Sequence, residues 1–211
     1  MKLKRLLQSC LLVLIILLGS VCNSDTIKYS SKITNMAEEM AKINADYVMD
    51  TYYSLSDSEK DEFVAYLEEY PENFPPFFYI LTADHIYKKD KDKALLWYFI
   101  GTIRSYEDVC MCKDITARSQ IQVYPMIAAK TTEYLQTQSE AISDLVQTAL
   151  DWDKTHKDRF DPTWACYHGM NAFYQKPELV SKWKRQKIKY DVRKSFKKIY
   201  VKSNIDFSQY R

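Results

Sequence analysis

The sequence predicts an all-α fold: a single domain of about seven helices arranged as helical hairpins, packed either as a bundle or as repeat-like units. Two observations lead to this prediction. Apolar residues recur at intervals of three and four along most of the chain, which is the spacing of one helix face. The 211 residues include only 3 glycines and no Asn-Gly or Asp-Gly pair, so the sequence lacks the short turns that favour β-hairpins.

The first 24 residues have the organisation of a signal peptide. A basic start precedes an apolar centre at residues 11–18, and small residues follow up to Ser24. This order is typical of export signals, and the apolar centre is too short to span a bilayer comfortably. We expect cleavage after Ser24, or alternatively after Cys22. Residues 25–211 would then be one all-α globular domain, located in the periplasm or secreted.

Cys22 also allows a second interpretation of this segment. A lipid attached to Cys22 would make the protein a membrane-anchored lipoprotein. Val21 precedes this cysteine, at a place where lipoprotein signals have glycine or alanine. Lipidation is therefore the alternative, and simple cleavage is the expectation.

The apolar spacing predicts two helices in the first part of the domain. Residues 31–53 are expected to form one helix, whose apolar face carries Ile33, Met36, Met40, Ile43 and Tyr47. The sequence Ser56-Asp57-Ser58-Glu59 is a capping box, in which the first Ser and the Glu satisfy free backbone N–H groups. A short helix is therefore expected from this box to Tyr70.

Residues 74–106 are predicted to form a hairpin at the centre of the core. Phe74-Pro75-Pro76 starts a helix that continues to Lys88, because proline is tolerated in the first turn. After a polar link, residues 94–106 are too rich in apolar side chains for a surface helix. We expect residues 110–113 to connect this hairpin to the next element.

Four further segments are predicted to be helical. Residues 115–135 form a helix with a kink or break near residues 122–124, because Pro125 lacks the N–H that a helix requires. A second capping box at residues 137–140 opens a helix, followed by a short helical piece at residues 161–169. Pro177 is expected to open the last helix. In the helix opened by the second capping box, the predicted buried side chains are Ile142, Leu145, Val146, Ala149, Leu150 and Trp152. In the last helix they are Ile188, Val192, Phe196 and Ile199.

Two stretches resemble known families. The segments Phe78-Tyr79-Ile80-Leu81-Thr82-Ala83 and Lys91-Asp92-Lys93-Ala94-Leu95-Leu96-Trp97-Tyr98 together resemble one unit of Sel1-like or tetratricopeptide helical repeats. The run Phe160-Asp161-Pro162-Thr163-Trp164, with His168-Gly169-Met170 after it, is similar to that of an uncharacterised family of exported, all-helical bacterial proteins. The first resemblance implies paired helices, and the second gives no information about an activity.

Three cysteines remain after the signal segment: Cys110, Cys112 and Cys166. Two of the three should form a disulfide in an oxidising compartment. Cys112 with Cys166 is the favoured bridge, because Cys112 lies further into the connection and is freer to turn. Cys110 with Cys166 is the alternative, since Cys110 and Cys112 would close a strained small ring.

The charges of the mature chain are segregated. Residues 25–175 carry 15 Lys or Arg and 25 Asp or Glu residues, whereas residues 176–202 carry 11 and 2. The basic last helix could pack on the acidic body, or it could bind an anionic partner. The candidate binding surface consists of Lys182, Lys184, Arg185, Lys187, Lys189, Arg193, Lys194, Lys197 and Lys198.

No pattern in the sequence supports catalysis, a metal site or a cofactor. The histidines His85, His156 and His168 lack the spacing of zinc ligands, and nucleophile elbows and phosphate-binding glycine loops are missing. Cys166 and His168 would form a reactive pair only if Cys166 were unbridged. Neighbouring acids such as Glu68 and Glu69 point about 100° apart on a helix, so they do not form an acid/base couple.

These observations favour an exported, non-enzymatic protein that binds another protein. An immunity or inhibitor protein directed against a periplasmic toxin is a concrete form of this hypothesis. The alternative is a cell-envelope accessory protein that binds anionic surfaces through its basic C-terminal helix. An enzyme of unrecognised type is the third hypothesis, and no nucleic-acid partner is expected.

Overall fold

The computed structural model describes residues 28–138 and 142–201. The predicted signal segment and the second half of the second capping box, residues 139 and 140, lie outside these residues. The chain divides into two units, residues 1–31 and 32–211, and of the first only residues 28–31 are described. The described helices are α2 (Ser31–Ala41), α3 (Ala45–Ser54), α4 (Asp57–Glu69), α5 (Phe77–Tyr87), α6 (Lys91–Met111), η1 (Ile115–Val123), α7 (Tyr124–Ile127), α8 (Ala129–Leu135), α9 (Ile142–Thr155), α10 (Thr163–Cys166), η2 (Met170–Phe173), α11 (Lys182–Phe196) and η3 (Lys197–Val201).

The all-α prediction is confirmed. Within the described ranges the chain forms no strand, and its β-structure is limited to an isolated antiparallel bridge between Cys112 and Leu179. η1 and η2 are 3-10 helices, and η3 is a π-helix. None of the helices in the described part is long and apolar enough to cross a membrane.

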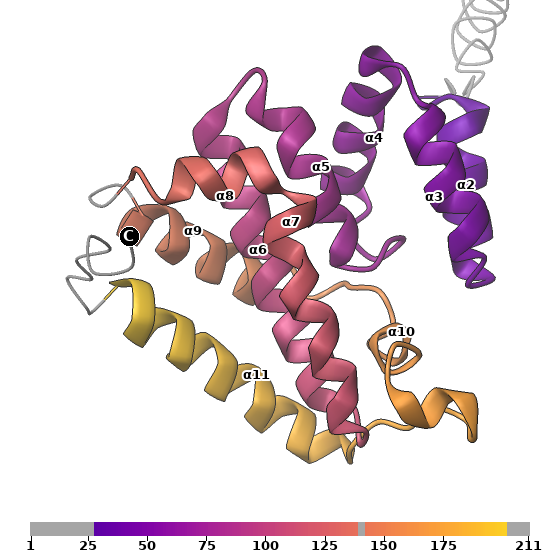
Figure 1. Ribbon diagram of the computed structural model, residues 1–211, viewed down its shortest axis with the longest axis vertical. Helices are drawn as coiled ribbons and strands as arrows, with labels where there is room; N and C mark the ends of the chain where they lie inside the picture. The colour runs from indigo at the N-terminus through magenta and orange to yellow at the C-terminus, as the bar shows by residue number, and fades with distance from the viewer. Residues whose placement is uncertain (1–27, 139–141, 202–211) are drawn as a thin grey trace, which may run out of the picture. The chain divides into compact units, whose positions relative to one another are not determined.

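Helix α6 is the central element of the larger unit. It packs against α5, α9, α11, η1, α8 and α10 (Figure 1). It lies close to α5, because a Cβ atom on Gly101 would lie 2.7 Å from Ile80 Cγ1 and 2.9 Å from the carbonyl oxygen of Pro76, which precedes α5. The predicted core hairpin is therefore confirmed. However, α6 extends to Met111, so the predicted connection at residues 110–113 begins later than expected.

The predicted helix over residues 31–53 is wrong in one respect, because it is two helices. α2 ends in a turn in which Ile43 adopts a φ of 61°, and Asn44 then caps α3 by accepting a hydrogen bond from the Tyr47 N–H. A positive φ is rare for a β-branched residue, and no glycine marks the turn in the sequence. As a result Ile43 is 50% exposed and Tyr47 is also exposed, although both were expected in the core.

The first capping box forms as predicted. The Ser56 N–H donates to Glu59 Oε2 at 2.7 Å, and the Glu59 N–H donates to Ser56 Oγ at 3.3 Å. The helix that it opens, α4, presents Phe63 to a set of aromatic rings. Phe63 meets Phe74 and Phe78 edge to face, with centroid distances of 5.0 and 5.8 Å. These contacts join α4 to the start of the central hairpin.

The segment 115–135 breaks where Pro125 requires it, but it also differs from the prediction. Its first part is the 3-10 helix η1, and the Tyr124 N–H donates to the Ile121 carbonyl three residues back. Pro125 lies in the first turn of α7, where its missing N–H has no helical partner to lose. A second break occurs at Ala128, which the sequence did not indicate.

The last helix begins at Lys182, and the prediction that Pro177 opens it is wrong. The preceding segment instead pairs with the end of α6: the Lys113 N–H donates to the Glu178 carbonyl at 2.9 Å, and the Val180 N–H donates to the Met111 carbonyl at 2.8 Å. On α11, Phe196 is buried, and Ile188 and Val192 are half-buried. Ile199 is exposed, so the prediction that it is buried together with the other three residues is wrong.

Candidate functional site

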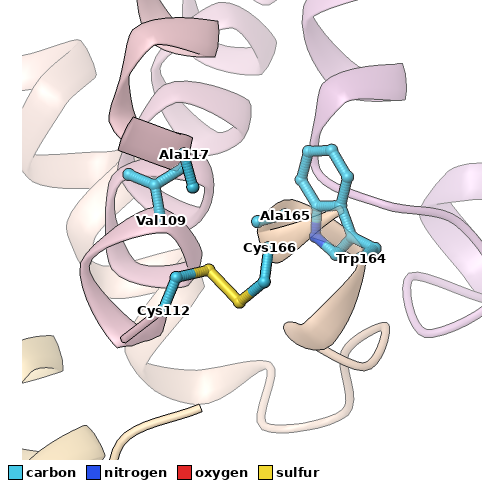
Figure 2. Close-up of a cluster of buried hydrophobic side chains, with 6 residues drawn as sticks. All are labelled: Val109, Cys112, Ala117, Trp164, Ala165 and Cys166. Atoms are coloured by element: carbon cyan, nitrogen blue, oxygen red, sulfur yellow. A yellow bond between two sulfur atoms is a disulfide. The ribbon is translucent and has the colours of Figure 1, made fainter. Parts of the chain in front are cut away.

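A disulfide joins Cys112, at the end of α6, to Cys166 of α10, with a Cα–Cα distance of 5.4 Å. Figure 2 shows it among buried side chains that include Val109, Ala117 and Trp164. This bridge is the favoured one of the two predicted pairings. Cys110, in the last turn of α6, lines the groove between α6 and α11. Cys110 is a free, half-buried thiol.

The chain after Cys166 forms a loop that is fixed at both ends on the same part of the fold. Its start is held by the disulfide, and its end is held by the pairing of Leu179 with Cys112. Residues 167–177 therefore leave and return to the C-terminal end of α6. The ends of this loop are set before any partner binds.

Asp114 holds the middle of this loop. Its Oδ2 accepts a hydrogen bond from the Asn171 N–H at 2.8 Å, and its Oδ1 accepts one from the Thr116 N–H at 2.9 Å. Hydrogen bonds from Thr116 and Asn171 lower the pKa of Asp114, so the carboxylate stays charged at neutral pH. A Cβ atom on Gly169 would lie 2.4 Å from Asp114 Oδ2, which explains a glycine at this close approach.

The loop presents large apolar side chains to solvent. Phe173 is 79% exposed and Tyr174 is 86% exposed. We call the exposed side chains of this loop and its neighbour on η1 the aromatic loop surface: Ile115, Tyr167, Met170, Phe173 and Tyr174. Exposed apolar residues concentrated in one short part of the surface are typical of protein-interaction sites.

A second feature is a cluster of charges where α11 meets the core, with buried carboxylates and with Arg193 of α11 half-buried. Three arginines face three carboxylates: Arg104, Arg159 and Arg193 with Glu107, Asp108 and Asp153. We call these six residues the buried charge cluster. The formal charges balance, which is what burial of ions in a low-dielectric interior requires.

Arg104 and Arg159 each connect two segments of the chain. Arg104 Nε donates to Asp153 Oδ1 at 2.8 Å, and its guanidinium lies 4.6 Å from the centre of the Trp152 ring. Arg159 donates to Glu107 and to Asp108 at 2.5 and 2.6 Å. The other oxygen of Asp108 accepts a hydrogen bond from Trp164 Nε1 at 2.8 Å. The cluster thus ties α6 to α9 and to the segment that leads into α10.

The carboxylates of the cluster differ in their pKa values. Burial, together with the neighbouring Asp153, raises the pKa of Glu107 to about 7 despite Arg159 and Arg193. Burial alone would also raise the pKa of Asp153, but Arg104 and Arg193 outweigh it and hold that pKa below its ordinary value. Burial also raises the pKa of Asp108, so the pKa values of Glu107 and Asp108 both lie above the ordinary ones.

The nine residues of the predicted basic surface are not equivalent. Arg193 belongs to the buried charge cluster, and Arg185 Nε donates to the Val180 carbonyl at 2.9 Å. Burial lowers the pKa of the half-buried Lys189. The remaining six are exposed: Lys182, Lys184, Lys187, Lys194, Lys197 and Lys198.

The candidate reactive residues are not brought together. Cys166 is bridged, so it does not form a thiol–histidine pair with His168. Burial lowers the pKa of His168 and raises that of the Cys110 thiol, which keeps both groups neutral. His85 lies against α4, with Nε2 2.9 Å from Asp61 Oδ1. Among the described residues, no group of three His, Cys, Asp or Glu side chains could hold a metal ion.

Two grooves border these features. One, of about 390 Å³, lies between α2, α3 and α10, and Met40, Trp164 and His168 are among its lining residues. The other, of about 750 Å³, lies between α6 and α11. Its lining is rich in aromatic rings, including Tyr106 and Phe196.

The sequence did not reveal the buried charge cluster or the aromatic loop surface. The signal for the cluster is the spacing of Arg104, Glu107 and Asp108 by three and four residues inside an otherwise apolar helix. The loop surface depends on Leu179 pairing with Cys112, a contact between residues far apart in the sequence. No local pattern predicts such a contact.

Comparison with known proteins gives no match: no family model fits the chain, and no curated protein or solved structure is similar to it.

Proposed function

We propose that this chain is an exported, non-enzymatic protein that binds another protein through the aromatic loop surface. The observation that supports the proposal is the exposure of Phe173 and Tyr174 on a loop that is fixed at both ends. Large aromatic side chains that are concentrated on one part of a surface mark interaction sites more often than singly scattered ones do. They are also the residue types that dominate the energetics of protein interfaces.

Fixing the loop in advance favours binding. A partner that ordered a free loop would lose affinity to the entropy of the chain and its side chains. Here the Cys112–Cys166 bridge and the Asp114 hydrogen bonds already hold the backbone next to Met170 and Phe173. A preset aromatic anchor of this kind suits an inhibitor, and an immunity protein against a periplasmic toxin is the form that we favour.

The exported location is part of the proposal. The signal-like residues 1–24 and the disulfide both fit an oxidising compartment, in which Cys112 and Cys166 stay paired. In the cytoplasm the same pair would tend to be reduced, and the start of the loop would lose its anchor.

Size-exclusion chromatography of the periplasmic fraction of the native host tests this function. We expect the wild-type protein to elute in a complex with another protein, and the double variant Phe173→Ala/Tyr174→Ala to elute as the free protein. Tyr53→Ala removes a tyrosine on α3 that is 65% exposed and should leave the complex intact. Elution of the wild type as the free protein, or equal loss in the Tyr53→Ala control, would contradict the proposal.

A further inference from the structure

Helix α11 has two faces with different tasks. One face attaches it to the body through Phe196, which is buried, and Arg193, which is paired with Glu107 and Asp153. The opposite face carries Trp183, which is 68% exposed, and Tyr190, which is 64% exposed. The attachment therefore fixes which side of α11 points to solvent.

Lysines alternate with these two aromatic rings on the outer face. At about 100° per residue, positions 183, 187, 190 and 194 fall within one side of α11, and Lys198 follows in the π-helix η3. We call these residues the α11 stripe: Trp183, Lys187, Tyr190, Lys194 and Lys198. All five are exposed, and Lys194 Nζ lies 5.9 Å from the centre of the Tyr190 ring.

The charge around the stripe has one dominant sign. Asp191 is the only acidic residue of α11, and Lys184 extends the positive charge beside Trp183. In the described part of the chain, the three lysines of the stripe form no ion pair with a carboxylate. Their charge is therefore available to an anionic partner.

We propose that the α11 stripe docks the protein peripherally on an anionic phospholipid membrane, with α11 parallel to its surface. Tryptophan and tyrosine prefer the boundary between headgroups and acyl chains, where the ring is apolar and its tip is hydrated. Lysine ammonium groups at the same depth meet lipid phosphates and extend their apolar stems toward the membrane. The stripe supplies both groups on one rigid, attached helix.

This surface is distinct from the aromatic loop surface. It lies on α11, whereas the loop precedes that helix and is fixed to the end of α6 (Figure 1). Either proposal can fail without the other.

Vesicle co-sedimentation of the processed, full-length exported protein tests the docking. The probes are vesicles of phosphatidylcholine alone and vesicles of phosphatidylcholine with phosphatidylglycerol. We expect binding only to the second kind, weakened by added salt because the Debye length shortens. The emission of Trp183 should shift to the blue on binding, and Trp183→Phe should lose this shift.

Two variants and their matched controls locate the surface. Lys187→Glu/Lys194→Glu should lower the vesicle partition coefficient about tenfold or more. Lys130→Glu/Lys154→Glu makes the same change in net charge on α8 and α9 and should lower it far less. Trp183→Ala/Tyr190→Ala should lower it several-fold, and Tyr53→Ala should not. Circular dichroism confirms that each variant remains folded.

Several outcomes would overturn the proposal. Equal binding of the wild type to both kinds of vesicle, or no binding to either, would do so. An equal loss of vesicle binding in the Lys130→Glu/Lys154→Glu control would show that net charge, and not the α11 stripe, determines binding. Unchanged vesicle binding after Trp183→Ala/Tyr190→Ala would show that the two rings do not insert into the membrane interface. Binding of a DNA oligonucleotide through the same lysines, without vesicle binding, would assign the stripe to nucleic acid instead.

Discussion

Arg193 of α11 lies with its Nε 3.2 Å from Glu107 Oε1 of α6. The same guanidinium also contacts Asp153 Oδ2 of α9 at 2.6 Å. One side chain therefore attaches the last helix to two elements of the core. The basic and acidic segments of the sequence therefore meet here, because an arginine of the basic segment pairs with two carboxylates of the acidic body.

Removing this arginine should loosen α11. Arg193→Met keeps the aliphatic length of the side chain but leaves Glu107 and Asp153 with fewer cations, so the free energy of unfolding should fall by roughly 2–4 kcal/mol. The neighbouring Lys194→Met is the matched control, and it should change stability by less than about 0.5 kcal/mol because Lys194 is exposed. Urea denaturation measures both. Equal effects of the two substitutions would contradict the role assigned to Arg193.

Glu107 should make stability depend on pH. Its pKa is about 7 in the folded protein, against an ordinary value of 4.5. Between these values the folded protein holds a proton that the unfolded chain has released, so the contribution of Glu107 to stability falls as pH rises through 7. Glu107→Gln replaces the carboxyl group with an amide, which does not titrate in this pH range.

The comparison of wild type with Glu107→Gln isolates this effect. Relative to the variant, the wild type should lose roughly 1–3 kcal/mol of unfolding free energy between pH 5 and pH 8. Glu133→Gln replaces an exposed glutamate and should show no such trend near neutral pH. A constant difference between wild type and Glu107→Gln across this range would show that Glu107 does not titrate there.

The body-facing side of α11 should also contribute through packing. Phe196 is buried, and its ring meets Tyr106 of α6 at a centroid distance of 5.6 Å. Phe196→Ala should lower the free energy of unfolding by roughly 3 kcal/mol, the usual loss for a buried phenylalanine. Lys184→Glu/Lys187→Glu should leave it nearly unchanged. Thermal unfolding of both variants checks the prediction, and a Phe196→Ala protein as stable as the wild type would show that α11 is not packed on the body.

The disulfide should stabilise the fold as well as the loop. It closes a separation of 54 residues, and the chain-entropy model assigns such a bridge about 4 kcal/mol. Cys166→Ser should lower stability by an amount of this order, while Cys110→Ser should have little effect because that thiol is free. Unfolding under non-reducing conditions measures the two. A larger loss in Cys110→Ser would indicate the alternative pairing.

Local patterns in the sequence predicted the parts of the fold that depend on neighbouring residues. The capping box at Ser56, the dense apolar hairpin and the break before Pro125 each follow from a few adjacent side chains. The turn at Ile43 was missed because its conformation is unfavourable for that residue type and no glycine marks it. The extended segment before α11 was missed because Leu179 pairs with Cys112, far away in the chain.

The features of the candidate site likewise differ in how far the sequence predicts them. A single disulfide could be predicted from the three cysteines of the expected mature chain, and Cys112 with Cys166 was the favoured of two pairings that the sequence left open. The contacts of Arg104 with Asp153 and of Arg159 with Glu107 could not, because they join residues about 50 positions apart whose proximity depends on how α6, α9 and the following loop pack. The exposure of Phe173 likewise follows from the tertiary fold.

Site-specific photocrosslinking from position 173 tests the central claim most directly. A photoreactive phenylalanine analogue replaces Phe173 in the exported protein in its native host, and the same analogue at the exposed Glu133 of α8 serves as the control. We predict a discrete adduct with another protein from position 173 that is absent from position 133. Gly169→Ala should weaken this adduct, because its added Cβ would collide with Asp114 and displace the loop. No adduct from position 173, or the same adducts from both positions, would contradict the assignment of the aromatic loop surface as a protein-binding site.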